Sequence, residues 1–164
     1  MPRRSWIPLA TAVLLAGCGA AESPDDRAAA EWAIGQGGVV DLVDRDVKVT
    51  VLAKLPEEPF RVEGIDLNRR KIDRAGLAKL APLEELRYLW LYDAGLQDAD
   101  LEHLARIESL EELEISFNDI SDAGLQRLAP LANLKTLYVR KTDVTADGAE
   151  RLRQQRGGLT VHIQ

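Results

Sequence analysis

Histidines and acidic pairs are the residues of this sequence whose chemistry could support catalysis. The two histidines, His103 and His162, fall on a predicted helix and a predicted strand, so we expect them on opposite faces. The pairs Glu112 with Glu114 and Glu111 with Glu112 could act as acid and base, but surface carboxylates more often only keep a protein soluble. The sequence shows no Ser/His/Asp grouping, metal-ligand cluster or glycine-rich phosphate loop. We therefore expect no enzymatic activity, no metal and no cofactor.

Aromatic side chains are concentrated at alternate positions of the predicted strands, a pattern suited to binding. Tyr88, Trp90 and Tyr92 alternate along one strand, so their rings project from the same side. Tyr138 lies two strands further on, at about 10 Å for strands spaced about 4.8 Å apart. Rigid aromatic residues supply contact area at low entropic cost and are enriched in interface hot spots. We call these four residues the aromatic strip. The candidate binding residues are the strip and the charged residues around it: Tyr88, Trp90, Tyr92, Tyr138, Asp66, Glu112, Glu114 and Arg140.

Strand propensity or burial under the N-terminal segment could also account for the aromatic strip. Aromatic residues favour strands for packing reasons alone, and the segment before the first strand could cover part of the strip. An exposed aromatic cluster is otherwise a liability on an acidic monomer, which favours the binding interpretation.

A period of 24 residues runs from Val62 to the end of the chain and determines which elements position these side chains. The columns of matched residues include Ile65, Leu89, Leu113, Leu137 and Val161, and two residues later Leu67, Leu91, Ile115, Val139 and Ile163. Such a period is the signature of a solenoid, whose units bury their apolar faces only by stacking.

Each repeat combines a short strand, a turn and a helix. In one repeat, residues 113–116 alternate with period two, and Leu125 and Leu128 then follow at helical spacing. Outward strand positions form columns, one of which is Asn68, Tyr92, Ser116, Arg140 and Gln164. Another column lies just before the helices, at N-cap positions: Asp73, Gln97, Ser121 and Thr145. We therefore predict an α/β fold with parallel strands on the concave face and helices on the convex face.

The pattern Leu110-x-x-Leu113-x-Ile115-x-x-Asn118-x-Ile120 resembles the leucine-rich repeat in its bacterial 24-residue form. The resemblance covers residues 62–164 and implies a solenoid that serves as a binding scaffold. The sequence departs from the family pattern at the asparagine column, which holds Arg70, Ala94, Asn118 and Thr142. Only Asn118 and, more weakly, Thr142 can serve there, which puts the order of the first two turns in doubt.

Residues 24–61 are predicted to form an N-terminal cap on the first repeat, because an uncovered solenoid end would expose its core. A helix from Pro24 to about Gln36 is expected, with Ala28, Ala29, Trp32 and Ala33 on one face. Two β-branched runs, residues 39–43 and 47–52, then suit a hairpin.

Residues 1–17 have the features of a bacterial lipoprotein signal peptide. Two arginines precede an apolar run that is too short for a permanent membrane span, and residues 15–18, Leu-Ala-Gly-Cys, resemble the bacterial lipobox. The resemblance implies lipid attachment at Cys18, cleavage before it and a tether over residues 18–23. An ordinary signal peptide that happens to contain a cysteine is the alternative.

Charge and cysteine content limit the partners. Cleavage after residue 17 removes Arg3 and Arg4, which takes the formal net charge from −6 to −8, so nucleic acid is an unlikely ligand. Cys18 is the only cysteine, so an internal disulfide is impossible.

We therefore expect an exported envelope protein, anchored to the membrane by lipid on Cys18, that binds a protein or peptide, or alternatively a glycan, with its concave face. Gly19 stands where an aspartate would resemble an inner-membrane retention signal, which favours the outer membrane. A structural envelope protein that self-associates through the same face is the alternative.

Overall fold

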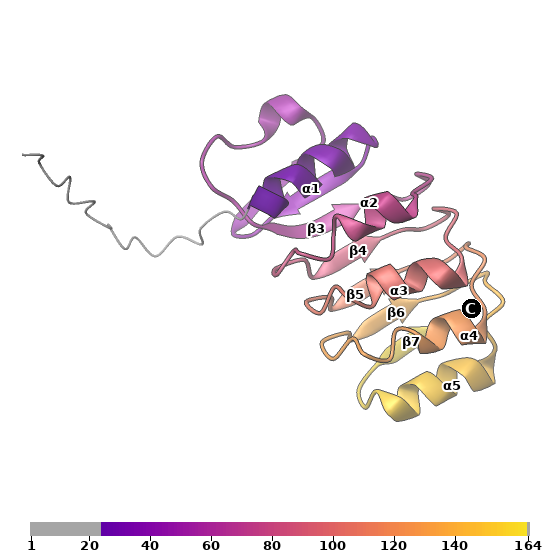
Figure 1. Cartoon of the computed structure of the whole chain (residues 1–164). Coiled ribbons are helices and arrows are strands. Elements are labelled where there is room, and N and C mark those ends of the chain that lie inside the picture. Colours follow the sequence, from indigo (N-terminus) through magenta and orange to yellow (C-terminus); the bar gives the residue numbers. More distant parts are fainter. Residues whose placement is uncertain (1–23, 164) are drawn as a thin grey trace, which may run out of the picture.

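The computed structural model describes residues 24–163, arranged as one layer of strands and one of helices (Figure 1). The strands are β1 Val39–Leu42, β2 Arg45–Val49, β3 Val62–Asp66, β4 Tyr88–Trp90, β5 Glu112–Glu114, β6 Thr136–Tyr138 and β7 Thr160–His162. The helices are α1 Pro24–Gly35, α2 Arg74–Ala78, α3 Leu101–Leu104, α4 Asp122–Gln126 and α5 Ala146–Gln155, with 3₁₀ turns at Leu52–Lys54 and Asp98–Asp100. The predicted signal peptide, the tether and Cys18 lie outside the described residues.

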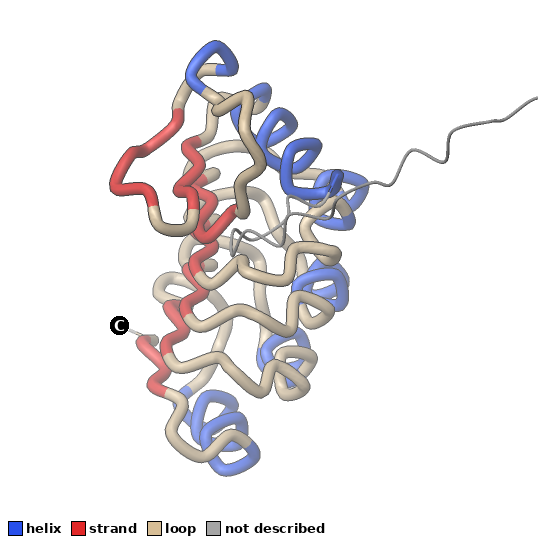
Figure 2. The backbone as a smooth tube through the Cα atoms, turned by 90° about the vertical axis from the view of Figure 1, so that its left-hand side faces the viewer, coloured by secondary structure: helices blue, strands red, loops and turns tan. Residues whose placement is uncertain are grey.

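One seven-stranded sheet runs through the molecule in the order β2-β1-β3-β4-β5-β6-β7. Strands β3 to β7 are parallel, and their register joins residues 24 positions apart, such as Leu89 with Leu113 and Leu113 with Leu137. Figure 2 shows these strands along one side of the molecule and the helices along the other. The predicted α/β solenoid is confirmed. We call the outward side chains of β3 to β7 the strand face, which is the predicted concave face.

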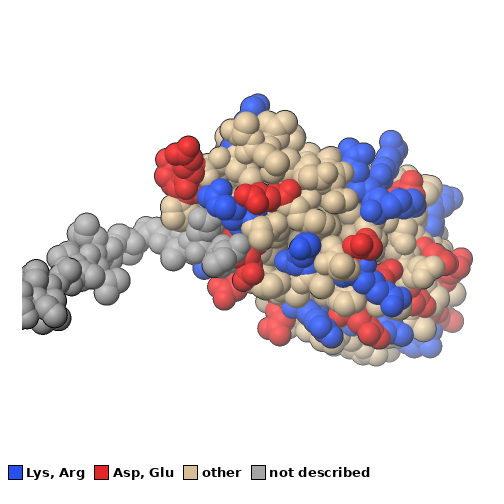
Figure 3. Space-filling view, turned by 45° about the horizontal axis from the view of Figure 1, so that its top comes forward, with Lys and Arg blue, Asp and Glu red and all other residues tan. Residues whose placement is uncertain are grey.

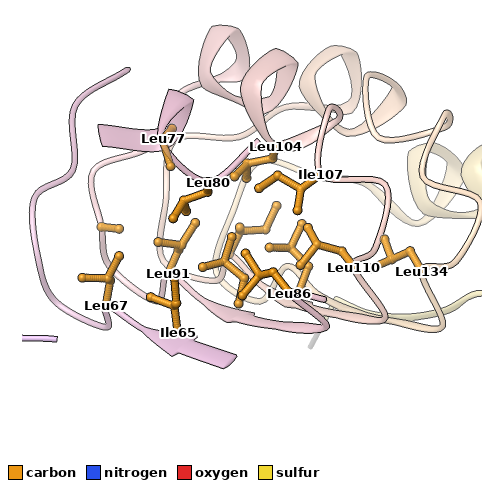
Figure 4. Close-up of a cluster of buried hydrophobic side chains, with 14 of the residues drawn as sticks. Ile65, Leu67, Leu77, Leu80, Leu86, Leu91, Leu104, Ile107, Leu110 and Leu134 are labelled. Atoms are coloured by element: carbon orange, nitrogen blue, oxygen red, sulfur yellow. The ribbon is translucent and has the colours of Figure 1, made fainter. Parts of the chain in front are cut away.

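The apolar columns fill the space between the strands and the helices. In Figure 4, Leu77, Leu80 and Leu104 approach from the helical layer, and Ile65 and Leu67 approach from the strand layer. All five side chains are fully buried. Since the side chains of neighbouring repeats meet in this space, each repeat depends on its neighbours for burial.

Two aspartates connect the starts of α4 and α5 to the repeats that precede these helices. Asp98 accepts hydrogen bonds from the backbone amide and hydroxyl of Ser121, at 2.8 and 2.5 Å. Asp122 repeats this arrangement 24 residues later with the amide and hydroxyl of Thr145, at 2.8 and 2.7 Å. Ser121 and Thr145 are the N-caps of α4 and α5, as predicted. The aspartates thus tie neighbouring repeats together on the helical side.

Glycine is required where these aspartates approach the next helix. A Cβ atom at Gly124 would lie 2.0 Å from Oδ1 of Asp98, and one at Gly148 would lie 2.0 Å from Oδ1 of Asp122. The spacing of these glycines therefore follows from inter-repeat contact, not from phosphate binding.

Asp122→Asn is expected to destabilise the protein at neutral pH and to have less effect in acid. Hydrogen bonds from the amide and hydroxyl of Thr145 lower the pKa of Asp122, with burial opposing and Arg151 assisting. A carboxyl whose folded pKa lies below its unfolded value, about 3.9, stabilises the fold above that pH and loses this contribution as pH falls through the folded pKa. Urea melts of both proteins at pH 7 and near pH 3 measure the difference. Asp143→Asn, at an exposed neighbouring position outside this contact, is the control, and an undiminished difference in acid would contradict the assignment.

The asparagine of the third repeat holds the turn before it. The Nδ2 of Asn118 donates to the carbonyls of Leu91 and Ile115, both at 2.9 Å. Its Oδ1 accepts from the amides of Ala94, at 3.0 Å, and Leu96, at 2.9 Å. The turn that contains Ala94 is therefore ordered by the next repeat, although it has no asparagine of its own.

Arg70 and Thr142 occupy the same column and make different contacts. Arg70 donates to the carbonyl of Gly37 at 3.0 Å, which connects the first turn to the N-terminal cap. Thr142 donates from its hydroxyl to the carbonyl of Val139 at 2.7 Å, in the weaker role expected for it. The first two turns are therefore ordered although they have no asparagine of their own, because the cap and the neighbouring repeat supply the hydrogen bonds.

Helix α1 and the hairpin of β1 and β2 pack against the first repeat. Strand β1 pairs antiparallel with both β2 and β3. Asp26 is fully buried under this cap, where it accepts from the amide of Val62 at 2.8 Å and pairs with Arg61 at 3.2 Å. The cap is thus joined to the first repeat by backbone pairing and by a buried carboxylate. We call β1 and β2 together the cap hairpin.

The buried face of α1 differs from the predicted one. Ala28 was expected to share one face with Ala29, Trp32 and Ala33, but it is exposed, whereas Ala29 and Ala33 are buried and Trp32 is half-buried. The buried residues of this helix also include Asp26, Ala30 and Ile34. The prediction for Ala28 was wrong because it followed apolar residues alone, whereas the buried face of the helix includes the carboxylate of Asp26.

Candidate binding surface on the strand face

The register of the sheet places most candidate residues in two columns. The first column pairs Tyr88 with Glu112, and the second pairs Asp66 with Trp90, Trp90 with Glu114, and Glu114 with Tyr138. These six side chains are all half-buried. The strand face therefore presents them partly to solvent, and they do not belong to the apolar core.

Tyr88 and Trp90 form one aromatic pair at the end of the face next to the cap hairpin. Their rings are nearly parallel, at 8°, with centroids 6.0 Å apart. The indole Nε1 of Trp90 donates to Oε1 of Glu112 at 3.1 Å, which fixes the ring against the next strand. Lys48 of β2 places its Nζ 5.7 Å from the centroid of Trp90.

A hollow of about 370 Å³ lies between this aromatic pair and the cap hairpin. It is lined by Asp41, Leu42, Arg45, Asp46, Val47, Lys48, Glu63, Tyr88, Trp90 and Glu112. The cap hairpin therefore forms a wall beside Trp90 without removing it from solvent. The expectation that the N-terminal segment could cover part of the aromatic strip is partly correct at this end.

Tyr92 belongs to a second aromatic pair that the sequence did not indicate. Its ring centroid lies 4.7 Å from that of Phe117, and the guanidinium of Arg69 lies 5.7 Å from the Tyr92 ring. Phe117 is 47% exposed and has a φ of 59°. The repeat register could have indicated the position of Phe117. It belongs to the column Arg69, Asp93, Phe117 and Lys141, in which each residue takes the left-handed conformation after its strand. An apolar ring at that position lies on the surface because the turn directs it outward.

Tyr138 stacks on His162 at the other end of the face. Their centroids are 4.7 Å apart and their rings differ by 11°, while the guanidinium of Arg140 lies 5.6 Å from the Tyr138 ring. His162 is thus on the strand face, as expected. The aromatic strip is a series of three separate ring clusters and not one continuous surface.

Two flanking carboxylates have local structural partners. Oδ1 of Asp66 accepts from the amide of Asn68 at 2.9 Å, and Oε1 of Glu114 accepts from the amide of Ser116 at 2.6 Å. Substituting either residue would therefore remove a backbone contact as well as a charge. Ser116, predicted to face outward, is buried, because its hydroxyl accepts from the amide of Arg140 at 2.9 Å. Gln164 of the same column lies outside the described residues.

On the helical side, two arginines pair with acidic side chains. Arg127 pairs with Glu102, and Arg151 pairs with Asp122 at 3.1 Å. His103 is half-buried on α3, on the side of the sheet away from His162. On the face in Figure 3, acidic and basic side chains are interspersed. Such pairing on exposed helices requires no ligand to explain it.

Within residues 24–163, no group of three or more histidine, cysteine, aspartate or glutamate side chains is placed to hold a metal ion. None of the helices described in that range is long and apolar enough to cross a membrane. The strand face presents ring clusters and carboxylates.

A family model and two solved structures are similar to parts of this chain. A family model described as Leucine Rich repeat matches residues 107–129. Internalin C2 of Listeria monocytogenes, a solved structure, is 27% identical with a TM-score of 0.42, and the match covers 53% of this chain and 36% of that chain. A second internalin of that organism, inlF, is 18% identical with a TM-score of 0.38, and the match covers 52% of this chain and 30% of that chain. The chain thus spans about a third of the length of these internalins. No curated protein matches it.

The repeat match and the observed parallel sheet fit the fold of an α/β leucine-rich repeat solenoid. This fold is generally used for binding between proteins and is typically a scaffold without enzymatic activity.

Proposed function

We propose that this protein is a lipid-anchored component of a bacterial envelope that binds a protein or peptide partner with its strand face. The observation that carries the proposal is the placement of the ring clusters: Tyr88, Trp90 and Tyr138 lie half-buried on this face, and Tyr92, the remaining tyrosine of the chain, lies half-buried in the turn directly after β4. The core does not require them there, because the inward positions of the same strands are filled by aliphatic side chains such as Leu89 and Leu137.

The state of these rings supports a binding role. Each tyrosine of the strip contacts another ring, and Trp90 is also held by Glu112. Side chains that are already ordered lose little entropy when a partner covers them. The face is therefore organised for contact before any partner arrives.

Photo-crosslinking in the native envelope tests the proposal. A photoreactive amino acid at Thr136, beside Glu112 on the strand face, is expected to trap a heterologous protein. The matched control is the same amino acid at Lys79, exposed on the helical side, which should trap little of that protein. Equal trapping from both positions, or none from Thr136, would move the site away from the strand face.

Lipid attachment at Cys18 has its own test. Cys18→Ser should give a protein that lacks the acyl chains and is no longer held in the membrane through its terminus, because the thiol is the group that accepts the lipid. Mass spectrometry of the mature protein measures the modification. An unmodified Cys18, or a mature terminus elsewhere in the leader, would contradict the anchor and with it the envelope location.

Self-association through the same face is the second candidate function. Three ring clusters on one surface could pack against those of another copy. Size-exclusion chromatography of the unlipidated domain distinguishes the two functions. Concentration-dependent oligomers would favour the structural role, and a monomer would favour a different partner.

A further inference from the structure

Between the cap hairpin and the Tyr88–Trp90 pair, the protein already holds one positively charged group, the ammonium of Lys48. The Nζ of Lys48 lies 3.3 Å from Oδ2 of Asp41 and 5.7 Å from the ring centroid of Trp90. A carboxylate beside an aromatic face is a combination that attracts ammonium and guanidinium groups. The Lys48 side chain itself is 68% exposed, so it can leave this position at little cost.

Charge in the hollow favours a cation over an anion. Four carboxylates line it, from Asp41, Asp46, Glu63 and Glu112, against two cations, Arg45 and Lys48. The chain as a whole is also acidic, with a formal net charge of −6. A field of this sign attracts a basic segment and repels an acidic one.

Glu112 provides a free acceptor next to the aromatic face. Its Oε1 is occupied by the indole of Trp90 at 3.1 Å, and within residues 24–163 its Oε2 has no hydrogen-bond donor. Because Glu112 lines the same hollow as Trp90, its carboxylate can pair with a guanidinium or ammonium that enters the hollow. The orientation of the ring and the position of the acceptor are thus set by one hydrogen bond.

We propose that this hollow is the specificity subsite of the strand face, and that it accepts an arginine or lysine side chain of the partner. The proposal rests on the proposed function, and it adds the chemistry of the partner: an extended segment that presents a basic residue. Lys48 is the internal competitor. When the partner binds, its cation takes the position on Trp90 and Asp41 that Lys48 holds in the free protein.

This competition predicts the direction in which each substitution changes the affinity for a basic peptide. Lys48→Ala is expected to strengthen binding of a basic peptide about threefold, because it removes the competing cation and frees the Asp41 carboxylate. Glu112→Gln should weaken the same binding about threefold, because it removes a charge while keeping an oxygen for the Trp90 indole. A lysine that merely contacted the ligand would give the opposite sign at Lys48.

Fluorescence anisotropy of a labelled Gly-Arg-Gly-Arg-Gly peptide measures these effects on the folded domain. Gly-Glu-Gly-Glu-Gly and chitotetraose are the acidic and neutral probes, and both are expected to bind more weakly. Lys79→Ala, which removes a lysine on the helical side, is the matched control and should change nothing. Circular dichroism confirms that each variant is folded.

Weaker binding by Lys48→Ala, equal binding of the acidic peptide, or stronger binding of chitotetraose would overturn the cation subsite. These results leave the proposed function standing if the crosslinked partner still needs Trp90. A partner whose binding is unaffected by Trp90→Ala would instead reject the strand face as the site. The two failures are therefore distinguishable.

Discussion

Leu113→Ala is expected to lower the free energy of unfolding by about 2 to 5 kcal/mol, the usual cost of a large-to-small change in a core. Leu113 is fully buried on β5, the middle one of the parallel strands β3 to β7, and is paired in register with Leu89 and Leu137. A cavity at this position affects both neighbouring repeats, because stability in a solenoid depends on nearest-neighbour interfaces. Urea or guanidinium melts followed by circular dichroism provide the measurement.

Thr136→Ala is the matched control for this prediction. Thr136 lies on the adjacent strand, half-buried on the strand face, and its backbone amide still donates to Glu111 after the change. Substitutions at such positions usually change stability by about 0.5 kcal/mol or less. Equal losses at Leu113 and Thr136 would show that the inward and outward columns are misassigned.

Trp90→Ala is expected to weaken partner binding by about 2 kcal/mol or more, which is roughly thirtyfold in affinity. Trp90 is the largest side chain of the strand face, and it takes part in both the ring pair with Tyr88 and the contact with Glu112. Truncation removes contact area and leaves Glu112 without its indole donor. Titration of the captured partner, with the fold confirmed by circular dichroism, measures the loss.

His103→Ala on the helical side is the control for the Trp90 prediction and should leave the partner affinity unchanged. Arg140→Ala tests the far end of the face, where an exposed charge is expected to act through the association rate and its salt dependence. Asp66 and Glu114 are poorer choices, because their carboxylates also accept hydrogen bonds from backbone amides. If the Trp90→Ala variant bound the partner with wild-type affinity, the ring clusters would reflect ordinary strand composition and would not form the binding site.

The repeat architecture could be predicted because its contacts are local and recur. A residue such as Leu113 meets its equivalents 24 positions away on either side, so the period by itself specifies the register. The N-caps Ser121 and Thr145 were recognisable for the same reason, since a cap depends on residues within the next turn. The helix and hairpin of the cap followed from helix-start residues and β-branched runs.

The candidate site was predicted only in part. The columns correctly placed Tyr88, Trp90 and Tyr138 on one face, because alternation along a strand determines which side a residue occupies. Their division into separate ring clusters was not visible, because it depends on rotamers and on neighbours such as Phe117 and His162. Phe117 was missed because it lies in a turn, outside the strand pattern.

The solenoid, its register and the side of the sheet on which each strand residue lies could be derived from the residues alone, because these follow from a period and from short-range geometry. The way in which the cap meets the first repeats became visible only in the fold. Antiparallel pairing of β1 with β3 includes a register shift between Asp41 and Leu42, and this non-repeating contact brings Lys48 over Trp90. The cap has no equivalent elsewhere in the chain, so no period could reveal its position. The hollow beside Trp90 therefore exists only in the folded molecule.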